Sequence, residues 1–208
     1  MAQSWKTFYN QGVTETKVIN DAEQLLESLD KLPEPVVKPA FIAVSGLPGT
    51  GKSYFCRRLA ERIPVIILES DAMRKMLFSS PAYSAVESAR LFQAIHHLIE
   101  QLLKKGVSVV LDATNLAEKN RERLYHIAYQ LNAKLILVRI EAPPEVVQER
   151  LRNRAEGTVS EEDHSEADWA VFQKMRTSVQ KINRNHFAVD TSRDIAPVLN
   201  KIVREVNR

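Results

Sequence analysis

Residues 46–53 constrain the fold of this chain more than any other segment. They read G-L-P-G-T-G-K-S and fit the pattern G-x-x-x-x-G-K-[S/T] of loops that wrap backbone N–H groups around nucleotide phosphates. An apolar run at 41–45 precedes them and a helix-like segment at 54–62 follows, which is the context that the motif requires. The sequence therefore predicts a phosphate-binding loop between a buried strand and a helix, and an ordinary Gly-rich turn is the alternative.

Each residue type in this loop has a physical purpose. The glycines lack a Cβ, so several backbone amides can point at one anion. Lys52 would place a positive charge at the β- and γ-phosphates, and the Ser53 hydroxyl would occupy one position around Mg²⁺. We expect the loop and the residue after it to bind the nucleotide: Gly46, Leu47, Pro48, Gly49, Thr50, Gly51, Lys52, Ser53 and Tyr54.

Strand patterns alternate with helix patterns along the rest of the chain. Short apolar runs after the first strand predict buried strands at 65–68, 107–111, 135–140 and 187–190. Helical spacing predicts helices at 84–105, 117–132, 169–184 and 194–206, a short helix within 69–78, and one that opens with the prolines at 143–144. This alternation predicts an α/β protein with a parallel sheet covered by helices on both faces.

Residues 1–40 differ from the rest and are expected to form a helical extension and a proline-containing linker before a single domain at 41–208. No apolar run reaches 18 residues and the N-terminus lacks a signal-peptide pattern, so we expect a cytoplasmic protein without membrane contact. The one cysteine, Cys56, is expected to pack in the core.

The residues that follow the strands should face the same crevice as the loop, because ligands bind outside the carboxyl ends of the strands in such sheets. Asp71 follows the second strand and would accept the proton of a hydroxyl that attacks the γ-phosphate. Arg74, one helical turn later, would hold the acceptor or its phosphate. The alternative is that Ser70 or Asp71 only caps the short helix.

Asp112 ends the third strand and is expected to orient Mg²⁺ beside the loop, usually through water. A turn residue that caps the next helix is the alternative. Thr114 and Asn115 come directly after it and either reach the acceptor or, for Asn115, cap the helix.

Three arginines on the helix after the fourth strand are candidates for a lid. Arg150 and Arg154 lie four residues apart on one helical face, with Arg152 between them, and the polar, acidic stretch 156–163 that follows suits a mobile loop. Ordinary surface arginines are the alternative. Trp169 and Phe172 are expected to pack in the core, although Trp169 has a second interpretation as a ligand contact.

The formal net charge of +3 is too small to indicate a nucleic-acid partner by itself. The segment 173–208 carries eight basic and three acidic residues, whereas 145–170 carries three arginines and eight acidic residues. A polyanionic partner is therefore permitted and only weakly favoured.

Four motifs together resemble a known family. The loop at 46–53, S-D-A-M-R at 70–74, V-L-D-A-T-N at 110–115 and the helix with Arg150 and Arg154 resemble AAA-type P-loop kinases related to polynucleotide 5′-hydroxyl kinases, zeta toxins and small-metabolite kinases. The resemblance covers about residues 41–192. It implies a three-layer P-loop NTPase fold with strand order 2-3-1-4-5 and a helical lid.

The resemblance also implies roles for single residues: Lys52 and Ser53 on phosphates and Mg²⁺, Asp71 as general base, Arg74 on the acceptor, and Arg150 or Arg154 as lid arginine. The expected activity is ATP- and Mg²⁺-dependent transfer of the γ-phosphoryl group to a hydroxyl of a polynucleotide 5′-end or a small metabolite. The acidic residues at 161–163 stand where a nucleic-acid channel would be basic. A module that hydrolyses ATP as a switch, without an acceptor, is the rival interpretation.

Overall fold

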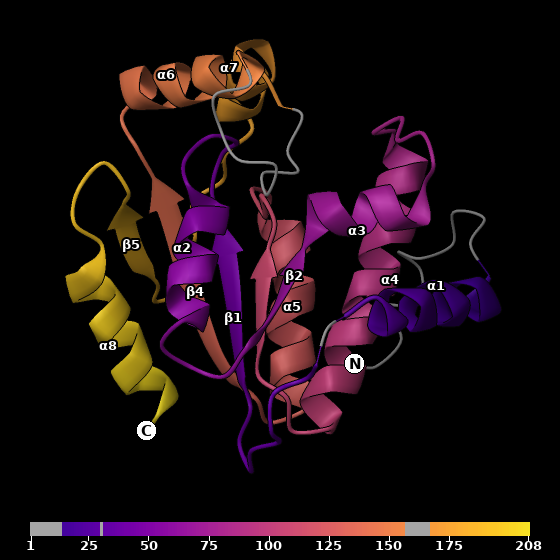
Figure 1. The fold of residues 1–208 in the computed structure, drawn as a ribbon. Coiled ribbons are helices and arrows are strands. Elements are labelled where there is room, and N and C mark those ends of the chain that lie inside the picture. Colours follow the sequence, from indigo (N-terminus) through magenta and orange to yellow (C-terminus); the bar gives the residue numbers. More distant parts are fainter. Residues whose placement is uncertain (1–13, 30, 157–166) are drawn as a thin grey trace.

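The computed structural model describes residues 14–29, 31–156 and 167–208 (Figure 1). Within these residues five parallel strands form one sheet in the order β2-β3-β1-β4-β5, as the sequence predicted. The strands are β1 (Ala40–Ser45), β2 (Ile66–Glu69), β3 (Val109–Asp112), β4 (Lys134–Glu141) and β5 (Phe187–Asp190). The protein is therefore an α/β P-loop NTPase fold with β1 at the centre of the sheet.

Helices cover both faces of the sheet and make it the middle of three layers (Figure 1). One face packs on α1 (Glu15–Glu27), α4 (Ala85–Lys104) and α5 (Glu118–Gln130), and the other on α2 (Lys52–Ala60) and α8 (Ala196–Val206). Alternate side chains of β1 supply the two cores: Phe41 points to the first, and Ile42 and Val44 point to the second. Cys56 is fully buried in the second core, as expected.

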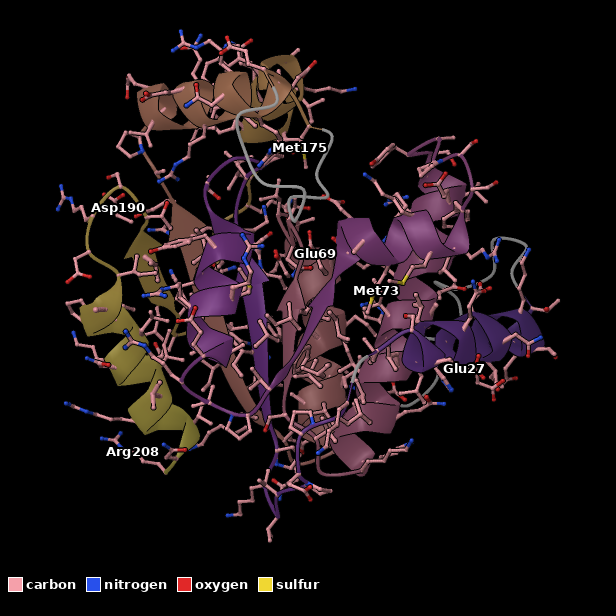
Figure 2. All side chains as sticks on the ribbon, in the orientation of Figure 1. Glu27, Glu69, Met73, Met175, Asp190 and Arg208 are labelled. Carbon is pink, nitrogen blue, oxygen red and sulfur yellow. The ribbon has the colours of Figure 1, made fainter. Side chains whose placement is uncertain are left out.

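The carboxyl ends of the strands meet at one edge of the sheet. Figure 2 shows Glu69 and Asp190, the last residues of β2 and β5, at this edge. The short helix α3 (Ser70–Leu77) starts there, and α6 (Pro144–Ala155) and α7 (Trp169–Arg176) lie across it above the sheet (Figure 1). The predicted mobile loop at 156–163 lies outside the described residues except for Glu156.

The predicted helix at 169–184 is too long, because α7 ends at Arg176. At its end the Thr177 and Ser178 hydroxyls donate to the Lys174 and Met175 carbonyls, both at 2.8 Å. Further on, the guanidinium of the buried Arg121 of α5 donates to the carbonyls of Gln180 and Lys181 at 3.0 and 2.9 Å. The Gln180 N–H donates to the Leu116 carbonyl at 3.0 Å. These backbone groups form hydrogen bonds with α5 and with the segment before it, so they do not form the hydrogen bonds of a longer helix.

Helix α1 shares the core of the sheet, since Ala22 and Leu25 are fully buried against it. Asp21 accepts two hydrogen bonds from the Arg90 guanidinium of α4, at 2.6 and 2.7 Å, and only 6% of its side chain is exposed. Gln24 donates to the Met76 carbonyl at the end of α3, at 3.1 Å. The extension thereby holds the two helices that flank one end of the site. No helix in the described part of the chain is long and apolar enough to cross a membrane.

We expect Asp21→Ala to lower the free energy of unfolding by about 2 kcal/mol, because Arg90 loses a bidentate partner inside a largely buried contact. Urea unfolding followed by circular dichroism measures the change. Glu61→Ala is the matched control, since the pair of Arg58 on α2 and Glu61, the residue after that helix, is about half exposed and should contribute much less. If both variants lose the same free energy of unfolding, the contact of α1 with α4 through Asp21 does not stabilise the fold.

Candidate nucleotide and phosphoryl-transfer site

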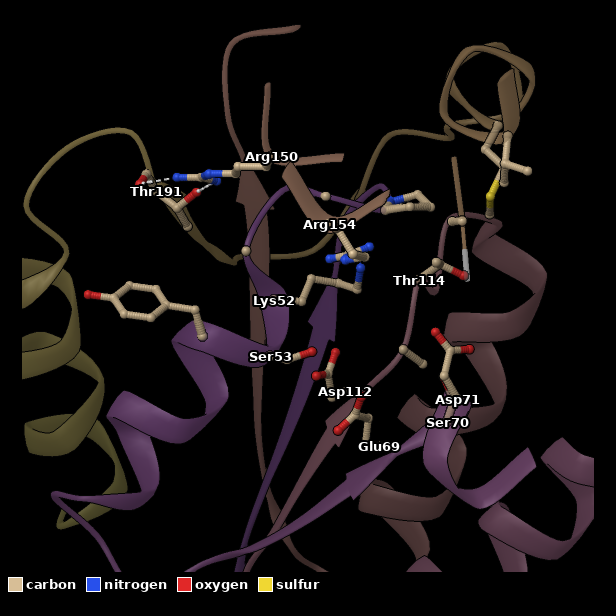
Figure 3. A pocket seen from close by; sticks show the side chains of 18 of the residues that line it. Lys52, Ser53, Glu69, Ser70, Asp71, Asp112, Thr114, Arg150, Arg154 and Thr191 are labelled. Atoms are coloured by element: carbon tan, nitrogen blue, oxygen red, sulfur yellow. Dashed lines mark hydrogen bonds between the residues drawn. The ribbon is translucent and has the colours of Figure 1, made fainter. Parts of the chain in front are cut away.

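A cavity of about 1020 Å³ opens at the carboxyl edge of the sheet (Figure 3). Its walls come from the loop before α2, the ends of β2 and β3, helices α3, α4, α6 and α7, and the segment after β5. A volume of this size is at the upper end of ordinary ligand sites. The crevice that the sequence predicted is thus a real cavity with the phosphate-binding motif at its floor.

The loop residues divide into those that face the cavity and those that shape the loop. Pro48, Gly49, Gly51, Lys52, Ser53 and Tyr54 line the cavity. Gly46, Leu47 and Thr50 do not: the Gly46 N–H donates to the Thr114 carbonyl at 3.1 Å, and the Thr50 hydroxyl donates to the Leu47 carbonyl at 2.7 Å. These three residues of the predicted nucleotide set therefore fix the loop to β3 and to itself.

Two glycines of the loop have backbone conformations that other residues avoid. Gly49 and Gly51 have φ values of +74° and +89°. A Cβ on Gly49 would lie 2.9 Å from a methyl group of Val147 on α6, and one on Gly51 would lie 3.0 Å from the Thr191 hydroxyl. The loop is therefore packed between α6 and the segment after β5, where a Cβ at either glycine would be crowded.

Lys52, Ser53 and Asp112 meet beneath the loop (Figure 3). The Lys52 ammonium donates to the Leu47 carbonyl at 3.1 Å, so it is held within its own loop. Burial raises the pKa of the Asp112 carboxyl, the Asp71 carboxylate adds to this, and the Lys52 charge and a hydrogen bond from Ser53 oppose it. Opposing charges in a buried place are typical of sites that bind charged ligands.

These residues fit a bound magnesium ion. Asp112 is 3% exposed, and its Oδ2 atom has no hydrogen-bond donor among the residues that the structure describes. A buried carboxylate oxygen without a donor is costly unless a cation or its water satisfies it. Ser53 and Asp112 would therefore hold Mg²⁺, which would supply charge stabilisation to the phosphates.

We expect Asp112→Asn to weaken Mn²⁺ binding to the nucleotide-loaded protein by about 10- to 100-fold, because the amide cannot offer a charged oxygen to the ion or its water. Titration of Mn²⁺ followed by electron paramagnetic resonance measures this without any turnover. Glu69→Gln is the matched control, since Glu69 stands opposite Asp112 in the β2–β3 register and lines the same cavity. If Glu69→Gln weakens Mn²⁺ binding more than Asp112→Asn does, Glu69 and not Asp112 is the metal ligand.

Asp71 lines the same cavity as the loop and lies next to Thr114 in Figure 3. It belongs to the first turn of α3, whose N-cap position is Glu69. In the described chain α3 has no side-chain capping hydrogen bond, so the alternative in which Ser70 or Asp71 serves as its cap is wrong. Asp71 thus lies in the first turn of α3 and lines the cavity at the same time.

Arg74 also lines the cavity, but its guanidinium already has protein partners. It forms a buried ion pair with Glu87 of α4, donates to the Ser88 hydroxyl at 3.3 Å, and lies 4.8 Å from the centre of the Tyr83 ring. Sequence reasoning missed Glu87, because nothing in the spacing of the two residues, 13 apart, marks them as a pair.

Two of the three arginines of α6 line the cavity and the third does not. Arg150 lines the cavity and donates to the hydroxyl and carbonyl of Thr191 at 2.8 and 2.9 Å. Arg154 lines the cavity above Lys52, as Figure 3 shows, whereas Arg152 is exposed and outside it. The preference for Arg150 and Arg154 over Arg152 therefore agrees with their placement.

Thr191 is a site residue that sequence reasoning missed. Its hydroxyl donates to the Thr50 carbonyl at 2.6 Å while it accepts from Arg150, so it links the loop to α6. A signal was present: Thr191 directly follows β5, and the rule that selected Asp71 and Asp112 at strand ends selects it too.

Asn115 has neither of the two roles considered for it. Its side chain donates to the Val44 carbonyl at 2.7 Å in a buried place, and the N-cap position of α5 is Ala117. Thr114, in contrast, lines the cavity and keeps the acceptor role open.

Trp169 is stacked on Phe172 with ring centres 4.9 Å apart. Both belong to an apolar cluster with Val147 and Leu151 that joins α6 to α7, so the packing interpretation is confirmed. Val171 and Met175 of α7, and not Trp169, line the cavity.

Comparison with known proteins identifies relatives of this fold and site. Residues 41–182 match a family described as an AAA domain. The L-seryl-tRNA(Sec) kinase of Methanococcus maripaludis is 30% identical over 107 residues, which are 49% of this chain and 41% of that kinase. The chain thus spans less than half of this relative's length.

Two solved structures show the same fold. The APS kinase CysC of Mycobacterium tuberculosis, in complex with AMPPNP and APS, has a TM-score of 0.62 at 15% identity and covers 84% of this chain and all of its own. Kti12 of Chaetomium thermophilum, in complex with ADP-AlF3, has a TM-score of 0.63 at 19% identity over 80% of this chain and 98% of its own. At such identities the likeness shows the fold alone.

Proposed function

The chain belongs to the AAA-domain family over residues 41–182, and from this premise we propose that it is an ATP- and Mg²⁺-dependent kinase that transfers the γ-phosphoryl group to an acceptor hydroxyl. One observation carries the proposal: Asp71, a carboxylate outside the loop, lines the same cavity as Lys52 and Ser53. A module that only binds or hydrolyses nucleotide needs the loop and the metal residues, but it needs no carboxylate that takes a proton from an acceptor. The names of the seryl-tRNA kinase and the APS kinase support a phosphotransferase.

In the proposed reaction the residues of this chain act by position and charge. The loop amides and Lys52 hold the β- and γ-phosphates, and Arg150 or Arg154 lies over the transferring group. The acceptor hydroxyl oxygen bonds to the γ-phosphorus while the bond from that phosphorus to the β–γ bridging oxygen breaks, so ADP leaves. Asp71 takes the hydroxyl proton and later releases it to water. Mg²⁺ at Ser53 and Asp112 would stabilise the charge that develops on the phosphates.

The experiment that tests this proposal is transfer from γ-labelled ATP to a panel of oligonucleotides with free 5′-hydroxyls, nucleosides and sugars. Label that appears in an acceptor supports the kinase. Steady release of labelled phosphate that no acceptor diverts would favour the rival, an ATPase that acts as a switch. Salt dependence distinguishes the two acceptor classes: binding of a polynucleotide should weaken steeply as salt is added, whereas binding of a small neutral acceptor should hardly change.

A further inference from the structure

Thr191 lies where the sheet, the phosphate-binding loop and α6 meet. It directly follows β5 and is 8% exposed, and its N–H donates to the Glu141 carbonyl at 3.0 Å, where the pairing of β4 with β5 ends. The sheet therefore holds the backbone of Thr191. Positions that are set by strands are more precise than positions that are set by loops, so the Thr191 side chain reaches the loop from a fixed place.

The Thr191 hydroxyl bridges a donor on α6 and an acceptor in the loop. It donates to the Thr50 carbonyl at 2.6 Å and accepts from Arg150 at 2.8 Å, and the Thr191 carbonyl accepts a second hydrogen bond from Arg150 at 2.9 Å (Figure 3). A guanidinium only donates and a carbonyl only accepts, so the single hydroxyl proton must point at Thr50. The direction of every hydrogen bond in this chain is thus set, and hydrogen bonds in a chain strengthen one another.

The hydrogen bond to Thr50 orients the peptide group between Thr50 and Gly51. This peptide group is planar and trans, so the Gly51 N–H points away from the carbonyl that Thr191 binds. A Cβ on Gly51 would lie 3.0 Å from the Thr191 hydroxyl and 3.3 Å from its methyl group, so Thr191 lies directly against this residue. Gly51 is the N-cap residue of α2, and Lys52 follows it. Thr191 thereby fixes the backbone from which the lysine of the loop extends.

The hydrogen bonds from Arg150 orient a cation that other charges do not hold in this place. Lys52 lines the same cavity with the same sign of charge, so repulsion opposes a second cation near the loop until an anion binds. The Asp190 carboxylate attracts Arg150, but no hydrogen bond joins the two among the described residues. Thr191 therefore sets the direction of the guanidinium. Donors that are fixed in advance stabilise developing charge without reorganisation at the moment of reaction.

We propose that Thr191 is a positioning residue for phosphoryl transfer: its hydroxyl fixes the Arg150 guanidinium relative to the phosphate-binding loop, so that both meet the same phosphates. This inference rests on the proposed function, because it requires the phosphates of ATP at the loop. Thr191 acts through Arg150 and the loop and does not touch the reacting atoms. The same contacts assign Arg150 to the phosphates that the loop binds.

The test removes the hydroxyl and keeps the branched shape of the side chain. Thr191→Val should lower kcat for label transfer from γ-labelled ATP by about 10- to 100-fold, because the cation and the loop lose their alignment. Thr191→Ser keeps a hydroxyl and should stay within about threefold of the wild type. Ser192→Ala is the matched control: it removes the neighbouring hydroxyl, which donates to Asp190 at 2.7 Å outside the cavity lining, and should leave kcat unchanged. Thr191→Ala has the same expected loss and replaces the valine variant if circular dichroism shows that variant to be unfolded.

A double-mutant cycle separates positioning from a merely structural role. Either Thr191→Val or Arg150→Ala breaks the same link, so Thr191→Val should lower kcat at most about threefold when residue 150 is already alanine. Effects that multiply overturn the inference, as does an unchanged kcat in Thr191→Val or a loss in Thr191→Ser as large as in the valine variant.

These outcomes differ from a failure of the proposed function. A wild type that releases phosphate from ATP but labels no acceptor contradicts the kinase alone, and the rate of phosphate release then takes the place of kcat with the same expected ratios. A wild type that neither transfers nor hydrolyses contradicts both proposals.

Discussion

Replacing Lys52 with alanine is expected to lower kcat/KM for phosphoryl transfer by about 1,000-fold or more. The ammonium is the cation that the loop itself carries at the cavity floor, and charge developing on the phosphates is stabilised most by donors fixed in advance. It is fixed here by its hydrogen bond to the Leu47 carbonyl. Initial rates of label transfer from ATP measure the loss.

The same hydrogen bond means that alanine can also disturb the loop. Lys52→Met keeps the length of the side chain without its charge, and it should lose the same activity as Lys52→Ala. Arg58→Ala removes a cation from the exposed side of the same helix and should change neither the rate nor ATP binding. Full activity in both Lys52 variants would contradict the assignment of the loop.

The sequence predicted the architecture well because its signals are local. The loop motif, the short apolar runs and the helical periodicities each lie within a few residues of one another, and alternating strands and helices allow few topologies. The strand order itself came from the family resemblance, and the structure confirms it. Helix α7 was predicted too long because the carbonyls of Gln180 and Lys181 accept from Arg121, about 60 residues away, instead of continuing the helix.

The site was predicted only in part, because only some of its residues are marked by signals that are local in the sequence. Asp71 and Asp112 follow strands, so topology alone brings them to the loop. The partners of Arg74 and Arg150 could not be predicted, because Glu87 and Thr191 are joined to them by packing between separate elements. Arg74 was expected to hold the acceptor or its phosphate, and only the structure shows that it forms a buried ion pair with Glu87.

Asp71→Asn is expected to lower kcat by on the order of 100-fold or more, with little change in the affinity for ATP. The amide cannot accept the proton of the attacking hydroxyl, whereas the loop that binds the nucleotide is untouched. Pre-steady-state transfer and equilibrium binding of a fluorescent ATP analogue separate the two quantities. A loss of ATP affinity at an unchanged kcat would make Asp71 a binding residue.

Because Asp71 lies in the first turn of α3, its charge also contributes to the stability of that helix, by about 0.3–1 kcal/mol. Thermal unfolding of the variant measures this part independently. If stability falls and turnover does not, the carboxylate is structural.

Hydrolysis of ATP without acceptor distinguishes the remaining models. A switch predicts that Asp71→Asn hydrolyses ATP at the normal rate and that no acceptor increases this rate. A kinase predicts that the acceptor-dependent rate alone collapses, since proton removal from the alcohol is the step that needs a carboxylate at this place.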